Sequence, residues 1–133
     1  MVRNTKLPPV TASITEAAKR MAAKTHLPVE KLERDLVKGT QAVNIAYARK
    51  AKENALDRGD FGEYRAWMIK EARFTAGVTQ KQLAGLIGTR QPSIARLEDP
   101  EYKGQSLNTI MKIAKALGMY FQPPRIVRGP VSV

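Results

Sequence analysis

The sequence predicts an all-α fold, and three observations support this prediction. Apolar residues recur at helical spacing in a series of stretches between Ser13 and Gly118. Typical helix-start residues precede these stretches, and glycines follow several of them. The composition, 43% hydrophobic and 26% charged with a mean hydropathy of −0.36, is that of a globular protein that can bury a compact core.

Residues 1–60 are predicted to form an N-terminal helical extension. Residues 1–12 contain Pro8 and Pro9 and no periodicity, so we expect a loose arm there. The capping box of Ser13 and Glu16 predicts a helix over about 14–25. "LPVEKLERDLVKG" predicts a second helix that ends before Gly39, and "TQAVNIAYARKAKENAL" a third. The glycines of "DRGDFGE" then place a domain boundary at about 57–62.

A second domain is predicted over residues 61–122. Its first helix covers about 63–75 and ends at Gly77; a capping box of Thr79 and Gln82 then starts a helix that ends near residue 87. The next helix, over about 91–98, has Pro92 in its first turn, and Ser106 caps a last helix that Gly118 closes. "MYFQ" (119–122) is compatible with a short C-terminal strand, and 123–133 form a tail rich in Pro and Gly.

The stretch "TQKQLAGLIGTRQPSIARLE" (79–98) has the spacing of a helix-turn-helix. This motif needs a small residue where two helices cross, a sharp turn, and apolar residues that lock the second helix. Ala84 and Gly88 meet the first two requirements. Ile94 and Leu97 share one helical face and meet the third. The polar residues of the second helix are then directed outwards; they are Gln91, Ser93 and Arg96.

The charge points to a polyanionic partner. The chain has 23 Lys and Arg residues against 12 Asp and Glu, a net charge of +11 and a pI near 10.2, and the excess is spread over both halves. Such a balance favours nucleic acid, although a basic surface that only aids solubility is the alternative. Charge alone says nothing about sequence recognition.

The run "RFTAGVTQKQLAGLIGTRQPSIARLE" (73–98), followed by "SLNTIMKIAKALG", resembles the Xre/Cro-type helix-turn-helix regulators. The resemblance covers about residues 64–121 and implies a lambda-repressor-like domain. Within that family, "TRQPSIARLEDPEY" and the last helix are most similar to HigA-type antitoxins. The chain departs from the family pattern at Arg90, where a Ser or Thr usually caps the recognition helix, so we expect Thr89 or Gln91 to cap that helix.

The resemblance also implies the DNA-binding residues. It implies that Gln80 touches the DNA backbone and that Gln91 and Ser93 approach base edges, and Gln and Ser suit these roles chemically. The N-terminus capped by Thr79 would direct backbone N–H groups at a phosphate. The remaining candidates are Lys81, Arg90, Arg96, Lys103 and Gln105. For Arg96, an ion pair with Glu98 or Asp99 is an equal alternative, and we expect Glu98 to make a structural bond.

These observations predict a sequence-specific repressor that binds double-stranded operator DNA as a homodimer. The sharper hypothesis is the antitoxin of a HigBA-like module, which autoregulates its operon and binds a ribonuclease toxin. The alternative is a free-standing phage or mobile-element regulator. An interaction protein that has lost DNA binding and an RNA-binding protein are further alternatives.

The rest of the sequence suggests no catalytic or metal chemistry. His26 is the only His and there is no Cys, so we expect no metal, no cofactor and no enzyme activity. No apolar run is long enough for a membrane span, so we expect a cytoplasmic protein that is associated with the nucleoid when bound to DNA. The N-terminal helices could pack on the DNA-binding domain, a dimer mate or another protein.

Overall fold

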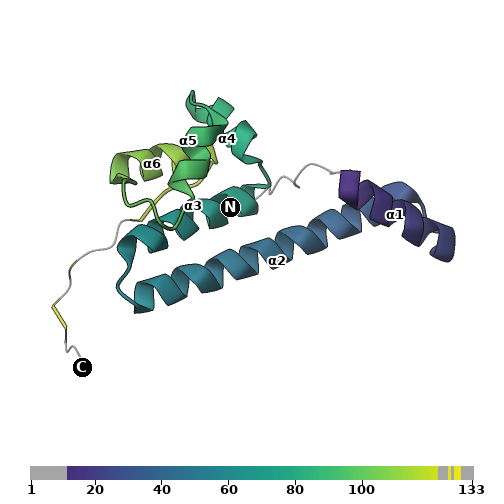
Figure 1. Cartoon of the computed structure of the whole chain (residues 1–133), viewed down its shortest axis with the longest axis horizontal. Helices are drawn as coiled ribbons and strands as arrows, with labels where there is room; N and C mark the ends of the chain where they lie inside the picture. The colour runs from purple at the N-terminus through teal and green to yellow at the C-terminus, as the bar shows by residue number, and fades with distance from the viewer. Residues whose placement is uncertain (1–11, 123–125, 127, 130–133) are drawn as a thin grey trace.

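The computed structural model describes residues 12–122, 126 and 128–129, and in this part of the chain the fold is all-α, as predicted, with six helices and no strand (Figure 1). The arm expected over 1–12 lies outside the described residues except for Ala12, which begins the first helix. Across the described residues, every helix is too short or too polar to cross a bilayer. The helices are α1 (Ala12–Thr25), α2 (Val29–Asp57), α3 (Phe61–Ala76), α4 (Gln80–Ile87), α5 (Gln91–Leu97) and α6 (Leu107–Ala116).

Helices α3 to α6 enclose one hydrophobic core. Ala84 is buried where α4 meets its neighbours, and Ile94 and Leu97 anchor α5, as the helix-turn-helix spacing predicts. A small side chain at position 84 lets two helix backbones approach closely. The buried residues of this core are Ile69, Leu83, Ala84, Ile94, Ile110 and Ile113.

Local capping fixes where these helices begin and end. The Thr79 hydroxyl accepts from the N–H of Gln82, whose side chain accepts from the N–H of Thr79, so the predicted capping box is present. Gly88 ends α4 with a φ of 74°, a left-handed conformation that glycine adopts without steric cost. Asp60 caps α3 by accepting from the N–H of Glu63, so α3 begins at Phe61, two residues before the predicted start.

The predicted break at Gly39 is wrong: α2 is one helix of 29 residues. Glycine in a helix interior costs only about 1 kcal/mol relative to alanine. Val37 and Gln41, on either side of Gly39, are both buried, so packing holds the helix together through this position. Gly39 itself is exposed, with nothing within 4 Å of the place where a Cβ would stand.

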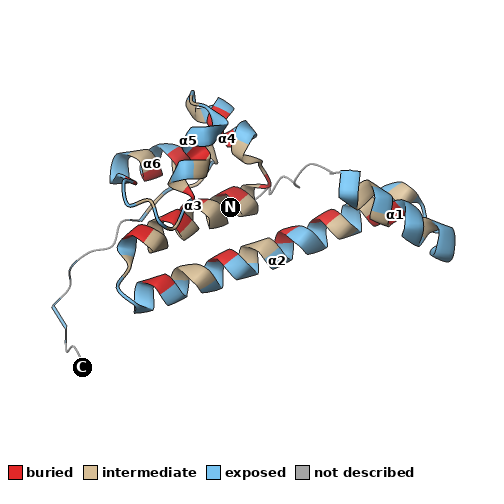
Figure 2. Ribbon diagram, in the orientation of Figure 1, coloured by how far each residue is buried: buried red, intermediate tan, exposed pale blue. Residues whose placement is uncertain are grey.

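Helix α2 runs antiparallel along α3 and joins the N-terminal segment to the helix-turn-helix body, which consists of α3 to α6. Figure 2 shows that the buried residues of its second half face α3. The Gln41 amide donates to the carbonyls of Phe74 (3.0 Å) and Thr75 (3.4 Å). Near its other end, Lys52 bonds Glu71 across the same interface (2.6 Å). The turn at 58–60 therefore connects two packed helices, and the division of the chain near residue 60 stays a proposal.

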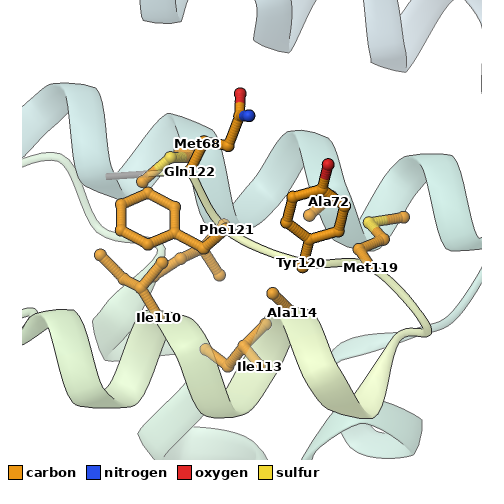
Figure 3. Close-up of a pocket in the computed structure, with 10 residues that line it drawn as sticks. Met68, Ala72, Ile110, Ile113, Ala114, Met119, Tyr120, Phe121 and Gln122 are labelled. Carbon is orange, nitrogen blue, oxygen red and sulfur yellow. The ribbon is translucent and has the colours of Figure 1, made fainter. Parts of the chain in front are cut away.

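The strand considered for 119–122 is wrong, because these residues have no regular secondary structure. A strand needs a second strand to pair with, and the rest of the described chain is helical. Instead Phe121 packs against the core, and the segment borders an apolar hollow of about 430 Å³ between α3 and α6. Figure 3 shows Tyr120 and Phe121 over this hollow, with Ile110 and Ile113 opposite them.

Candidate nucleic-acid interface

A buried ion pair holds the helix-turn-helix to α3. Arg73, in the last turn of α3, donates from Nε to Oε2 of Glu98 (2.6 Å) and from Nη2 to Oε1 (2.9 Å). Glu98, which follows α5 directly, is only 3% exposed. The Nη1 of Arg73 also donates to the carbonyl of Val78, in the link between α3 and α4 (3.1 Å). The structural bond expected for Glu98 is confirmed, and Arg73 is its partner.

Two glutamines continue this network to the surface. Gln80, at the start of α4, donates from Nε2 to Oε1 of Glu98 (3.0 Å). Gln91, at the start of α5, donates from Nε2 to Oε1 of Gln80 (2.6 Å). A Gln side chain has two N–H donors and one carbonyl acceptor, so the exposed Gln91 keeps its carbonyl and one N–H unused in these bonds. These are the two groups that a Gln needs to bond the N6 and N7 of an adenine.

The N-terminus of α4 has the geometry of an anion site. Its capping box uses the N–H groups of Thr79 and Gln82, while those of Gln80 and Lys81 have no partner within the helix. The positive end of the helix dipole and the exposed Lys81 side chain add charge of the right sign. This end of α4 is therefore suited to contact a phosphate.

The outer face of α5 is exposed and carries the remaining recognition candidates. Arg90, Ser93 and Arg96 are all exposed. Among the described residues Arg96 forms no ion pair, so the alternative pairing with Glu98 or Asp99 is not present. The expected cap from Thr89 or Gln91 is wrong: Arg90 is the N-cap residue, and no side chain bonds the first turn of α5. The Gln91 side chain instead bonds Gln80.

Lys103 and Gln105 lie apart from these candidates. The Nζ of Lys103 bonds Oδ1 of Asp60 (2.9 Å) and the carbonyl of Pro100 (3.3 Å). Gln105 is 5% exposed and donates to the carbonyl of Leu97 (3.1 Å), so its side chain lies inside the protein. In the structure, both residues hold the loop after α5 against the body.

Asp60 is a further element of this loop attachment. The hydrogen bond from the N–H of Glu63 and, to a smaller extent, the bond from the ammonium of Lys103 lower the pKa of Asp60 below its ordinary value of 3.8. Sequence reasoning did not include this residue or Arg73, although both have local signals. Asp60 stands three residues before a Glu at a helix start, and Arg73 is the first residue of the run that resembles the Xre/Cro-type regulators.

Comparison with known proteins supports the assignment of α4 and α5 as a helix-turn-helix. Residues 68–122 match the family model of the Cro/C1-type HTH DNA-binding domain. The match begins inside α3, covers α4 to α6 and ends with the segment that packs on the core. Searches of curated proteins and of solved structures gave no match to the chain. Residues 68–122 therefore form a helix-turn-helix domain of the Cro/C1 type.

Proposed function

We propose that the protein is a sequence-specific transcriptional repressor that binds double-stranded operator DNA in its own promoter. The observation that carries this proposal is the hydrogen bond between Gln80 and Gln91, because it orients an exposed side chain that is suited to read an adenine. The Arg73–Glu98 pair fixes that geometry before DNA arrives. A preorganised side chain loses less conformational entropy on binding than a free one.

The proposed contacts fall into two chemical classes. Thr79, Gln80 and Lys81 bind the phosphate backbone through N–H groups and an ammonium, which positions the domain on the duplex. Gln91 and Ser93, at the start of α5, contact base edges in the major groove. Arg90 and Arg96 flank these residues and pair with guanine or phosphate. Lys103 and Gln105 act indirectly, by holding the loop after α5.

We further propose that the repressor acts as a homodimer on two half-sites. A recognition helix of seven residues reads only a few base pairs, so a single copy has limited specificity. Two copies that bind half-sites one helical turn apart double the sequence that is read. The test is a measurement of the protein's molar mass by light scattering at micromolar concentration, for the protein alone and with DNA. One copy per duplex would contradict the dimer.

The finer proposal is that the repressor is a HigA-like antitoxin. It is supported by the similarity of residues 89–102 and of α6 to that group. The charge of +11 opposes it, because ribonuclease toxins are themselves generally basic and like charges repel. This charge favours the alternative of a free-standing phage or mobile-element regulator. A neighbouring reading frame for a short basic ribonuclease, whose product co-purifies with this chain, would support the antitoxin.

The deciding experiment for the repressor is a footprint on the chain's own promoter at increasing salt. We expect protection of a short inverted repeat that persists at moderate salt, because base contacts add to the salt-dependent phosphate contacts. A transcription assay from the same promoter should show lower output when the protein is added. Protection without sequence preference, lost as salt rises, would contradict the proposal.

A further inference from the structure

The first twelve residues of α2 project beyond the helix-turn-helix body. The Gln41 amide is bonded to the carbonyls of Phe74 and Thr75 in the last turn of α3, and α2 is antiparallel to α3. Residues 29–40 therefore continue past the C-terminal end of α3, and Figure 1 shows this overhang with α1 folded against it. At 1.5 Å per residue the overhang is about 18 Å long.

The overhang leaves the body at the end that carries the phosphate-binding candidates. Arg73, near the same end of α3, bonds Glu98, and Glu98 bonds Gln80 in the first turn of α4. Only three residues separate α3 from α4, and the last of them, Thr79, is the N-cap of α4. The projecting part of α2 and the N-terminus of α4 thus start from the same end of α3.

Two cations lie on the side of the overhang that is continuous with the interface between α2 and α3. Arg34 and Lys38 precede the α3-bonded Gln41 by seven and three residues, and side chains at these spacings share one helical face. Both are exposed, and neither forms an ion pair or side-chain hydrogen bond among the described residues. Glu30, an acid on this face, does not pair with Arg34.

The neighbouring acid on the helix, Asp35, already has a counter-charge. Asp35 pairs with Lys31 at 2.9 Å. The hydrogen bond from Lys31 lowers the pKa of Asp35 below its ordinary value of 3.8, and the charges of Lys38 and Arg34 lower it further. Helix α1 is attached on a different side of α2, where Thr15 donates to Glu33 (2.8 Å). Arg34 and Lys38 therefore remain available to an anion.

We propose that Arg34 and Lys38 form a second DNA contact, on the phosphate backbone that flanks the site read by α5. This inference rests on the proposed DNA-binding function and extends it beyond the helix-turn-helix. An overhang of about 18 Å spans about five base pairs at 3.4 Å per pair, so the contact falls just outside the recognised half-site. Its chemistry is charge neutralisation without base reading, which lengthens the site and makes binding more sensitive to salt.

The test compares two DNA lengths and three forms of the full chain. A duplex is selected from a random library with the wild-type protein and trimmed to a core that holds only the base pairs whose sequence the selection fixes. This core is then compared with the same core extended by ten base pairs of unrelated sequence at each end. The double variant Arg34→Gln/Lys38→Gln removes the proposed contact. The matched control Arg20→Gln/Lys24→Gln removes the same two charge types from exposed positions on α1 that have no ion pair.

We expect the wild type and the α1 control to bind the extended duplex more tightly than the core, and the Arg34/Lys38 variant to bind both alike. Loss of two phosphate contacts should lower the slope of log K against log salt by about 1.8. The wild-type advantage over the variant should then shrink about tenfold between 50 and 200 mM salt. In the Arg34/Lys38 variant, protection of the DNA from hydroxyl radicals should be lost only at the outer flank. Circular dichroism and thermal unfolding check that each variant is folded.

The outcomes separate this inference from the function on which it rests. Specific binding to the core with no gain from the flanks overturns the second contact and leaves the repressor intact. An equal loss in the α1 control also overturns it, because the effect would then be one of general charge. If no duplex is selected from the library at all, the proposed function and the second contact both fail.

Discussion

Arg73 and Glu98 form a buried two-point ion pair, with N–O distances of 2.6 and 2.9 Å, that joins the last turn of α3 to the end of the recognition helix. The same carboxylate accepts a hydrogen bond from Gln80, and Gln80 in turn accepts one from Gln91. One charge pair therefore supports the core of the domain and also orients the side chains of its proposed DNA surface. If Gln80 and Gln91 contact DNA as we propose, stability and recognition are coupled through Glu98.

Replacing Glu98 by Gln should unfold the domain more easily, because it leaves the Arg73 guanidinium buried without a counter-charge. Breaking a buried pair from one side typically costs about 3–5 kcal/mol. The free energy of unfolding from urea titration measures this loss. Glu101→Gln, which removes an exposed acid from the following loop, serves as the control and should change stability by less than about 0.5 kcal/mol. A loss below about 1 kcal/mol in Glu98→Gln would show that the pair contributes little.

Replacing Gln91 by Ala should change which DNA site is preferred. The variant loses the carbonyl and N–H that we assign to a base edge, at a cost of about 1–3 kcal/mol at one base position. Competition binding against a library of single-base operator variants measures this preference. If the ranking of sites stays the same as for the wild type, Gln91 does not read a base.

Replacing Lys81 by Ala should weaken binding to all DNA sequences by a similar factor. Its ammonium lies in the first turn of α4, where we expect a phosphate and no base. The slope of log K against log salt should fall by about 0.9. Lys115→Ala, in the last turn of α6, makes the same charge change away from the proposed surface and should leave the slope nearly as it is. Loss of affinity for one sequence only would point to base contact by Lys81.

The features that the sequence predicted correctly depend on neighbouring residues. The capping box of Thr79 and Gln82 and the left-handed turn at Gly88 each follow from a few adjacent positions. The helix-turn-helix core follows from spacing within one short stretch, because Ala84, Ile94 and the residues around them have fixed places in the motif. Local rules of this kind need no knowledge of the rest of the fold.

The features that the sequence did not reveal depend on tertiary packing. Gly39 looks like a helix end, but burial of Val37 and Gln41 on either side outweighs the cost of glycine in a helix. Gln105 looks like an exposed polar residue near the recognition helix, but it is buried against the carbonyl of Leu97. Arg73 and Glu98 are 25 residues apart, and nothing in their spacing shows that they meet.

The packing of α2 on α3 should weaken in acid because of Glu71. Burial disfavours ionisation of its carboxyl, but hydrogen bonds from Lys52 and Arg49 outweigh burial and lower its pKa below the ordinary value of 4.5. A lowered folded-state pKa stabilises the fold at pH values above 4.5, and this stabilisation is lost as pH falls through the folded-state value. The measurement is the free energy of unfolding between pH 7 and 3.

The variant Glu71→Gln isolates this effect. At pH 7 it should be less stable than the wild type, and the difference should shrink as the pH falls below 4.5. Lys52→Gln removes the shorter of the two bonds, at 2.6 Å, and should reduce the pH dependence in the same direction. A difference between wild type and Glu71→Gln that stays constant down to pH 3 would contradict the assignment.

Replacing Gly39 by Ala should stabilise the protein. Gly39 lies within α2, outside the left-handed region, and nothing stands within 4 Å of an added Cβ. Alanine restricts the unfolded chain and favours the helix, so the gain should be about 0.5–1 kcal/mol. Urea titration measures it, and circular dichroism should show no loss of helix. If the chain broke at this position, as its sequence suggests, alanine would bring no such gain.

The matched control is Gly88→Ala, which should have the opposite sign. An added Cβ at Gly88 also meets nothing within 4 Å, so the two sites are equally open. They differ in backbone conformation, because Gly88 has a φ of 74°, where an L side chain costs about 1–2 kcal/mol. The same chemical change should therefore stabilise at one glycine and destabilise at the other. Equal effects at both positions would mean that backbone conformation does not decide the outcome.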